Sequence, residues 1–272
     1  MSSDEVSGGV LRALRRVTSG IAAMAFARDY GRLITLNAVE RPHYGYIVLR
    51  AADLARRLGL DRISVLEFGV AGGRGLVNLE QHAERISALT SVRIEVYGFD
   101  TGRGLPPPKD YRDLPYIWQE NDFAMEEAAL RGKLKRALLV LGDIATTIPD
   151  FVAKHDPAPV GAIAFDLDYY SSTVDAFRIF SIPESYRLPR IFAYFDDIYS
   201  SDLGHVGPRV GVPLAISEFN RDNENLDISP LTHLEFRYAP ARAWHRQIFS
   251  CADFAHSRFN DFILPQGRQL PL

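Results

Sequence analysis

The chain has 272 residues, of which 47% are hydrophobic and 24% charged, which is the composition of a globular protein and not of a disordered or fibrous one. Its formal net charge of −3 provides no broad basic surface, so nucleic acid and anionic membranes are excluded as first expectations for a partner. No apolar run approaches the roughly 18 residues needed to cross a bilayer. The single cysteine, Cys251, cannot form an internal disulfide, which fits a reducing compartment. We therefore expect a soluble, cytoplasmic protein.

The first sixty residues have helical patterning. Apolar residues recur at helical spacing over 10–28 and 44–58, and Gly59 is placed to end the second helix. The apolar stretch 21–27 imitates a secretory signal, but it follows an acidic start and continues into charged residues, which favours an amphipathic helix. We expect residues 1–60 to form a helical extension that acts as a lid or as a contact between two copies of the chain.

From residue 61 onward, predicted strands and helices alternate. Residues 63–68 form a strand that leads through the glycine-rich turn 69–75 into a helix over 76–89. Further strands are predicted at 92–99, 137–141, 161–165 and 190–195, and further helices at 123–134, 148–154, 172–180 and 213–220. Residues 233–238 and 244–249 are expected to pair as a C-terminal antiparallel hairpin. This order predicts an α/β, Rossmann-like domain over 61–272 with a mainly parallel seven-stranded sheet.

Polar residues follow the predicted strands at their carboxyl ends. They are Gly69, Asp100, Asp143, the pair Asp166 and Asp168, and the adjacent Asp196 and Asp197. An open parallel sheet binds ligands beyond the carboxyl ends of its strands, so these residues are expected to meet at one rim.

The glycine turn predicts a nucleotide-like ligand, because glycines let the backbone approach a ligand and the following helix offers free N–H groups. The dinucleotide fingerprint fits poorly, since Asp100 lies 31 residues after Gly69 where an acid is expected about 20 residues on. At the end of the second strand, Asp100 could accept both hydroxyls of a ribose, and Asp143 could accept from an adenine amino group. Taken alone, each aspartate also fits the role of a helix N-cap. The glycines, taken alone, also fit a tight turn that binds no ligand.

Two sets of motifs resemble a known family. Glu67-x-Gly69-x-x-x-Gly73, Gly98-Phe-Asp100-Thr-Gly-Arg-Gly104-Leu-Pro106, Gly142-Asp143 and Ile148-Pro149 resemble the class I S-adenosylmethionine-dependent methyltransferases. Asp166-Leu-Asp168-Tyr-Tyr170-Ser-Ser-Thr173 together with Asp196-Asp197 resembles the macrocin-type O-methyltransferases, metal-dependent enzymes that methylate sugar hydroxyls of macrolides. The resemblance covers about residues 63–220.

The resemblance implies a role for each matched residue. Glu67, Gly69 and Gly73 would line the methionine part of the cofactor, Asp100 would bind its ribose and Asp143 its adenine, and Asp166, Asp196 and Asp197 would be ligands of Mg²⁺. The chain departs from the family at two positions. It has Ile198 where a hydroxyaromatic usually follows the paired acids, and Gly102 where an aromatic is usual, which loosens the assignment of the substrate.

The metal prediction has a physical basis, because three carboxylates at one rim repel each other unless a hard divalent cation neutralises them. Whether Asp166 or Asp168 is the inner ligand stays open, since residues two apart on a strand face the same side. Asp166 or His205 would then take the proton of the acceptor hydroxyl. Against the metal prediction, Asp196 and Asp197 are adjacent and would point in opposite directions in strand geometry. Against a catalytic role for His205, a lone histidine in a loop is typically a surface residue.

The leading interpretation is an S-adenosylmethionine-dependent, magnesium-assisted O-methyltransferase for a small hydroxylated acceptor, such as a sugar, a polyketide or another natural-product intermediate. Two alternatives remain. One is an enzyme that uses the same cofactor site for another reaction, and the other is a catalytically inactive binding or scaffold protein.

Overall fold

The computed structural model describes residues 29–238 and 240–264. Their strands form a seven-stranded sheet in the order β3-β2-β1-β4-β5-β7-β6. The parallel strands are β1 (Arg62–Phe68), β2 (Arg93–Asp100), β3 (Leu138–Leu141), β4 (Val160–Phe165) and β5 (Arg187–Phe195). The remaining two, β6 (Leu226–Pro230) and β7 (Ile248–Asp253), are antiparallel to each other, and β7 is antiparallel to β5. The predicted α/β fold with a mainly parallel seven-stranded sheet is confirmed.

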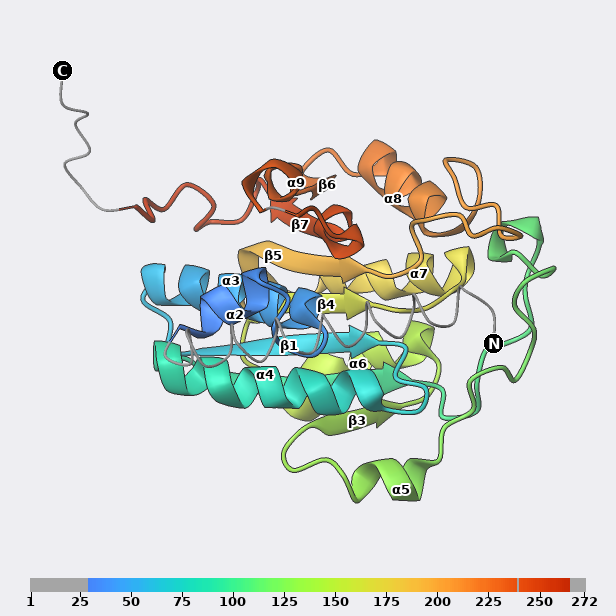
Figure 1. Cartoon of the computed structure of the whole chain (residues 1–272), viewed down its shortest axis with the longest axis horizontal. Helices are drawn as coiled ribbons and strands as arrows, with labels where there is room; N and C mark the ends of the chain where they lie inside the picture. The colour runs from blue at the N-terminus through green and yellow to red at the C-terminus, as the bar shows by residue number, and fades with distance from the viewer. Residues whose placement is uncertain (1–28, 239, 265–272) are drawn as a thin grey trace, which may run out of the picture.

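Helices cover both faces of the sheet, because alternate strand residues are buried on opposite sides. Ile63 and Val65 of β1 pack in one cluster with α3 (Pro42–Arg57) and α4 (Arg74–Thr90). Leu66 and Phe68 pack in a second cluster with α6 (Ile144–His155), α7 (Tyr170–Ala176) and α8 (Gly211–Asp222). The long loop between β2 and α5 (Glu127–Arg131) lies at the side toward which the arrowheads of β1 and β4 point (Figure 1).

The described part of the N-terminal segment packs on the sheet. α2 (Tyr30–Thr35) and α3 contribute buried side chains to the same cluster as β1 and α4. The predicted helix over 44–58 is confirmed by α3, whereas the one over 10–28, including the signal-like stretch, lies outside the described residues. A boundary at residue 60 and a role as lid or dimer contact stay predictions.

The predicted C-terminal hairpin used the wrong residues. Residues 233–238 form the short helix α9 (His233–Arg237) instead of a strand, with Leu234 buried and Phe236 88% exposed. The edge strand is β6, where Ile228 is buried and both of its backbone groups bond the Asn220 side chain of α8, at 2.8 and 3.0 Å. This tertiary contact, which satisfies an open sheet edge, outweighed the alternation that suggested a strand at 233–238.

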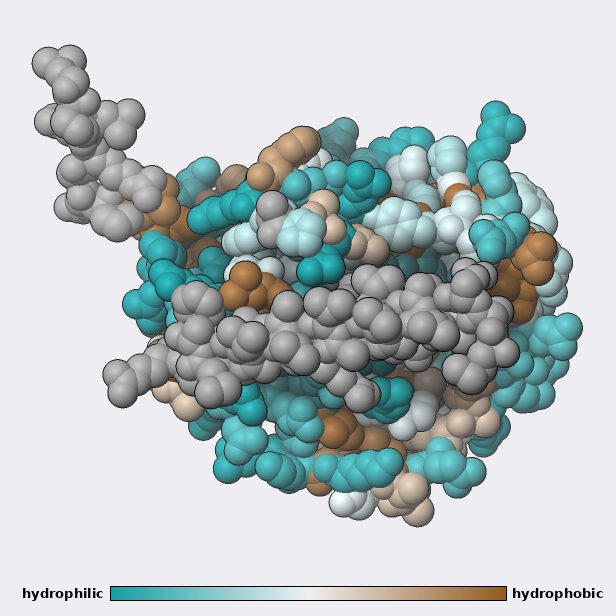
Figure 2. Space-filling model, in the orientation of Figure 1, coloured by the Kyte–Doolittle hydropathy of each residue, from teal (hydrophilic) through white to brown (hydrophobic). Residues whose placement is uncertain are grey.

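Three predicted helices differ from the structure by more than two residues at one end or both. The one expected over 172–180 is α-helical only to Ala176 and continues as a 3-10 helix over Phe177–Ser181. Only residues 127–131 of the helix expected over 123–134 are α-helical, and α6 begins four residues earlier than expected because Asp143 caps it. None of the described helices is long and apolar enough to span a membrane. Hydrophilic side chains cover most of the coloured surface in Figure 2, with hydrophobic ones in small separate groups.

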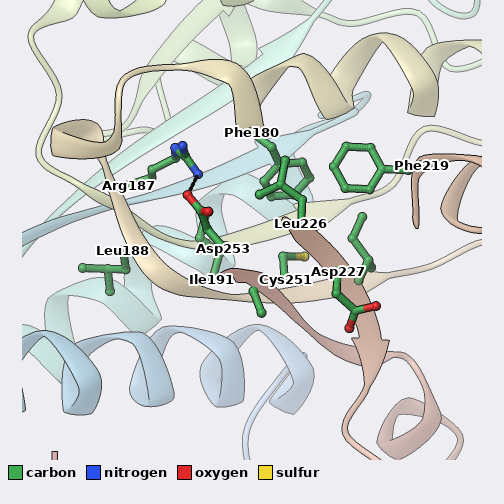
Figure 3. A pocket seen from close by; sticks show the side chains of 11 residues that line it. Phe180, Arg187, Leu188, Ile191, Phe219, Leu226, Asp227, Cys251 and Asp253 are labelled. Atoms are coloured by element: carbon green, nitrogen blue, oxygen red, sulfur yellow. Dashed lines mark hydrogen bonds and ion pairs between the residues drawn. The ribbon is translucent and has the colours of Figure 1, made fainter. Parts of the chain in front are cut away.

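Cys251 is buried in the sheet. It lines a cavity of about 10 Å³ between β5, β6 and β7, which is room for about one water molecule (Figure 3). Burial raises the pKa of its thiol, which keeps the sulfur protonated and unreactive. At one end of this cavity Arg187 forms an ion pair with Asp253, in which both side chains are largely buried.

Candidate active site

A row of phenylalanines across four strands sets the position of the site. Phe99, Phe68, Phe165 and Phe195 are in register on β2, β1, β4 and β5, with neighbouring ring centroids 4.8, 5.5 and 4.6 Å apart. The next residue along each strand is Asp100, Gly69, Asp166 and Asp196, respectively. Residues that are far apart in the sequence therefore lie side by side at one rim, and the predicted convergence is confirmed.

The glycine turn brings β1 close to the backbone that follows β4. Gly69 has φ of +84°, and a Cβ atom there would overlap the carbonyl oxygen of Asp166. Gly73 has φ of +80° at the start of α4, where a Cβ atom would overlap the side chain of Leu130. Both positions therefore favour glycine: Gly69 because the backbone of Asp166 is close, and Gly73 because the side chain of Leu130 is close.

Asp100 holds the glycine turn in place. Its Oδ2 accepts from the N–H groups of Val70 and Ala71 at 2.8 and 2.9 Å, and its Oδ1 accepts from Gly102 at 2.7 Å. Asp143 is the N-cap of α6 and accepts from the N–H group of Ala145 at 2.8 Å. Asp143 thus has the helix-cap role that was the alternative to ligand binding, whereas Asp100 caps none of the described helices and holds the turn, and both also line the cavity.

This cavity has a volume of about 550 Å³. Most predicted site residues line it: Glu67, Gly69, Asp100, Asp143, Asp166, Asp168, Asp196 and Asp197. Trp118 and Phe123 of the loop after β2 add aromatic surface. A pocket of this size that combines apolar walls with a few polar groups is typical of a site for a cofactor or a small molecule. Gly73, the N-cap residue of α4, does not line the cavity.

Glu67 is a buried carboxyl group that lines the cavity. It shares a sheet face with Ile63 and Val65, so it points toward α3, where the hydroxyl of Tyr44 donates to its Oε1 at 2.6 Å. Its Oε2 is buried and has no hydrogen-bond partner among the described residues. Burial raises the pKa of Glu67 to about 8, against the lowering effect of the Tyr44 hydrogen bond. The unused acceptor marks a place for a hydrogen-bond donor from a ligand.

Asp166, Asp196 and Asp197 form a group of three carboxylates. Each offers one oxygen, and these oxygens lie within 4.8 Å of one another. Burial, and next the charges of Asp196 and Asp197, raise the pKa of Asp166 to about 8. Burial and the charges of Asp168 and Asp196 raise the pKa of Asp197 to about 8. The sequence prediction that these three residues meet is confirmed, and the adjacent aspartates can both take part because β5 ends at Phe195.

Asp168 lies beside this group without belonging to it. Because β4 ends at Phe165, the chain leaves strand geometry before Asp168, which has φ of +58°. Its N–H group donates to Oδ2 of Asp197 at 3.0 Å. Within the described chain, the geometry therefore favours Asp166 over Asp168 as a member of the carboxylate group.

Comparison with known proteins identifies the fold. No family model matches the sequence, and no curated protein sequence matches it. The solved structure of the calicheamicin methyltransferase CalS11 is similar, with 20% identity, coverage of 94% of each chain and a TM-score of 0.54. That of the O-methyltransferase NovP matches with 12% identity, coverage of 78% of this chain and 80% of NovP, and a TM-score of 0.50. This chain has the class I methyltransferase fold. The resemblance inferred from the motifs is confirmed at the level of the fold.

In this methyltransferase fold, the carboxylate group is supported from α3 and β5. The hydroxyl of Tyr194 donates to Oδ1 of Asp196. The ring of Tyr194 stacks on His43 with centroids 4.2 Å apart and contacts the ring of Tyr44 edge-on at 5.7 Å. Burial lowers the pKa of His43 to about 3, so the imidazole is neutral. Tyr44, which donates to Glu67, and Tyr194, which donates to Asp196, are therefore in ring contact, so packed aromatic side chains link the two carboxylates.

His205 lies apart from these residues. It is exposed on the loop after β5, its N–H group donates to the hydroxyl of Tyr116 at 2.8 Å, and it does not line the cavity. The sequence reasoning did not identify Arg41 or Tyr44, because α3 precedes the strand and glycine pattern that located the site. The one signal in the sequence was the pair Arg41-Pro42, which marks the start of a helix. The burial of Tyr44 in that helix is visible only in the structure.

Proposed function

We propose that this protein is an S-adenosylmethionine-dependent, magnesium-assisted O-methyltransferase that acts on a small hydroxylated molecule. The observation that carries the proposal is the presence, in one cavity, of a glycine turn held by Asp100 and a group of three carboxylates. The fold supports it, as does the structural similarity to two methyltransferases, CalS11 and NovP. A sugar, a polyketide or another natural-product intermediate is the class of acceptor that we propose.

The cavity fits an adenosine-containing cofactor. Asp100 accepts three backbone N–H groups, yet a carboxylate has about four lone-pair positions, so acceptor capacity remains for a ribose hydroxyl. Asp143 lies at the edge of the same cavity and has one oxygen outside the helix cap for an adenine amino group. The buried, unpartnered Oε2 of Glu67 accepts a donor from the amino-acid end. We assign these three residues to the ribose, the adenine and the methionine part of the cofactor.

The carboxylate group fits a hard divalent cation. Its three ligand atoms are all carboxylate oxygens, which suit Mg²⁺ and which leave positions for water or a substrate. Burial, and next the neighbouring carboxylates, raise the pKa of Asp166 and of Asp197 to about 8, and a bound cation would favour the charged form of both. We propose that Asp166, Asp196 and Asp197 bind Mg²⁺.

S-adenosylmethionine supplies a methyl group on a positively charged sulfur, and magnesium lowers the pKa of a hydroxyl that it binds. Asp166 is our candidate for the base that takes the acceptor proton, because it lies at the rim next to Gly69, whereas His205 is exposed on a loop. Opposite charges combine in the transfer step, so the protein has little charge to stabilise in the transition state. Its main contribution is alignment of the two reactants and exclusion of water, for which Trp118 and Phe123 provide apolar walls.

Mass spectrometry of acceptors incubated with S-adenosylmethionine tests the proposal. A panel of hydroxylated sugars and polyketides is incubated with the wild-type protein and Mg²⁺, with added chelator, and with the variant Asp196→Asn. We expect a mass increase of one methylene on one acceptor class, lost with chelator and with the variant. Methylation that is unaffected by chelator would contradict the metal assignment. No methylation, together with no binding of S-adenosylhomocysteine, would favour the alternative of a scaffold protein.

A further inference from the structure

Arg41 occupies a strained backbone position at the wall of the cavity. It immediately precedes α3, with φ of +42° and ψ of +61°, and Pro42 follows it as the first residue of the helix. A left-handed conformation is unfavourable for a side chain with a Cβ atom, and a following proline disfavours helical backbone further. Strain of this kind is retained where the position of the residue is useful, so the side chain of Arg41 deserves a functional explanation.

The guanidinium of Arg41 lies at the same wall as Glu67. It is 5.4 Å from the centroid of the Tyr44 ring, and the hydroxyl of that ring holds Oε1 of Glu67. Its charge lowers the pKa of Glu67 and of Asp166, against the effect of burial in each case. Arg41 therefore lines the same cavity as these two carboxyl groups and is close enough for its charge to act on them.

Arg41 differs from the other two cationic residues that line the cavity. Arg74 forms an ion pair with Glu40 at 3.3 Å, and Lys109 forms one with Asp175 at 3.4 Å. In residues 29–238 and 240–264, no carboxylate lies within ion-pair distance of Arg41, and its guanidinium lies over the Tyr44 ring. A guanidinium in a cavity without a carboxylate partner is suited to bind an anionic group of a ligand.

A cationic donor and a buried free acceptor therefore lie at one wall. The guanidinium of Arg41 can only donate, and the Oε2 of Glu67 is buried with no donor among the described residues. An α-amino acid has the matching pair of groups, a carboxylate and an ammonium attached to the same carbon. A ligand without that end would leave both residues unsatisfied.

We propose that Arg41 binds the α-carboxylate of the amino-acid end of the cofactor while Glu67 accepts from its α-ammonium group. This inference rests on the proposed function, in which S-adenosylmethionine occupies the cavity, and it adds Arg41 as the determinant of affinity for the amino-acid end. Arg41 binds the cofactor and takes no part in the transfer of the methyl group.

Calorimetric titrations with two ligands test the assignment. S-adenosylhomocysteine has the amino-acid end, and 5′-methylthioadenosine has the adenosine and the sulfur without it. For the variant Arg41→Gln we expect at least a tenfold weaker affinity for S-adenosylhomocysteine and a change of less than twofold for 5′-methylthioadenosine. The control Arg85→Gln removes a cation that also lies over a tyrosine ring, 5.5 Å from the centroid of Tyr30, but does not line the cavity, and it is expected to bind both ligands within about twofold of the wild type.

Equal affinity of wild type and Arg41→Gln for S-adenosylhomocysteine would overturn the inference, as would an equal loss for both ligands, which indicates a structural effect. If the variant does not fold, the wild type is titrated with the decarboxylated analogue of S-adenosylhomocysteine. The inference then requires at least tenfold weaker binding than that of the parent compound, and equal binding would overturn it. A wild-type protein that binds neither S-adenosylhomocysteine nor 5′-methylthioadenosine would contradict the proposed function itself.

Discussion

Replacing Gly69 with alanine would place a methyl group where the backbone of Asp166 lies. The residue has φ of +84°, and its Cβ atom would overlap a carbonyl oxygen, which cannot rotate away as the end of a flexible side chain can. A left-handed conformation costs a residue with a Cβ atom about 1–2 kcal/mol. Forcing an extra methyl group into a packed region costs about 1–3 kcal/mol more. We therefore expect Gly69→Ala to lower the free energy of unfolding by about 2–5 kcal/mol.

Two other glycines separate these contributions. Gly59 also has positive φ, at +72°, but a Cβ atom there meets nothing within 4 Å, so Gly59→Ala should show only the backbone cost. Gly72 has neither feature, so Gly72→Ala should leave the stability within about 0.5 kcal/mol of the wild type. Because Gly72 lines the cavity, its new methyl group should nevertheless weaken binding of S-adenosylhomocysteine.

Thermal unfolding followed by circular dichroism provides the assay. For a protein of this length, each kcal/mol corresponds to about 2–4 °C in melting temperature, so Gly69→Ala should melt at least about 4 °C below the wild type. It should also melt below Gly59→Ala. If the two variants melt at the same temperature, the close approach of the glycine turn to the backbone after β4 is not present, and the reasoning about this rim is refuted.

Three more predictions concern the carboxylates. Asp196→Asn should abolish the rise in melting temperature produced by Mg²⁺ while changing the affinity for S-adenosylhomocysteine in chelator less than twofold; a rise that survives would contradict the proposed metal ligands. Tyr194→Phe removes a hydrogen bond to Asp196 and should weaken Mg²⁺ binding by about 2–13-fold, measured by calorimetry, and unchanged affinity would show that the hydroxyl does not position this ligand. Because the pKa of Asp166 is raised from 3.8 to about 8 in the folded protein, the stability that this group contributes is complete below about pH 4 and is lost as the pH rises to about 8. Each proton that only the folded state retains corresponds to about 1.4 kcal/mol per pH unit, so the metal-free melting temperature should fall between pH 6 and 8, and added Mg²⁺ should reduce that fall. A metal-free melting temperature that rises over this interval would contradict the burial of the group.

The parallel strands could be predicted because each has a hydrophobic pattern that local sequence determines. The phenylalanines at the ends of β1, β2, β4 and β5, each followed by a polar residue or glycine, were a sequence signal for the rim, and their register in the sheet follows from the parallel pairing. The last two strands were harder, because β6 depends on the contact of its edge with Asn220. That contact links two elements and has no local pattern.

The sequence predicted which residues meet where they lie at strand ends, and missed those that are brought in by packing between elements. The carboxylate group follows directly from Asp166 and Asp196-Asp197 at neighbouring strand ends. Arg41 reaches the cavity, and Tyr44 reaches Glu67, only because α3 packs on the same sheet face as Glu67; the local sequence marks the start of a helix there but not this packing. His205 shows the converse case: a residue type suited to proton transfer lies on a loop, and no strand or helix places it at the rim.

The central claim is that one cavity holds both S-adenosylmethionine and Mg²⁺. It is tested most directly by calorimetric titration of the purified protein with S-adenosylhomocysteine, with Mg²⁺ present and after treatment with chelator. The account predicts micromolar binding, about −8 kcal/mol, together with a separate binding heat for Mg²⁺ that is absent in Asp196→Asn. No heat with S-adenosylhomocysteine in either condition, and a melting temperature that does not change on its addition, would contradict the account.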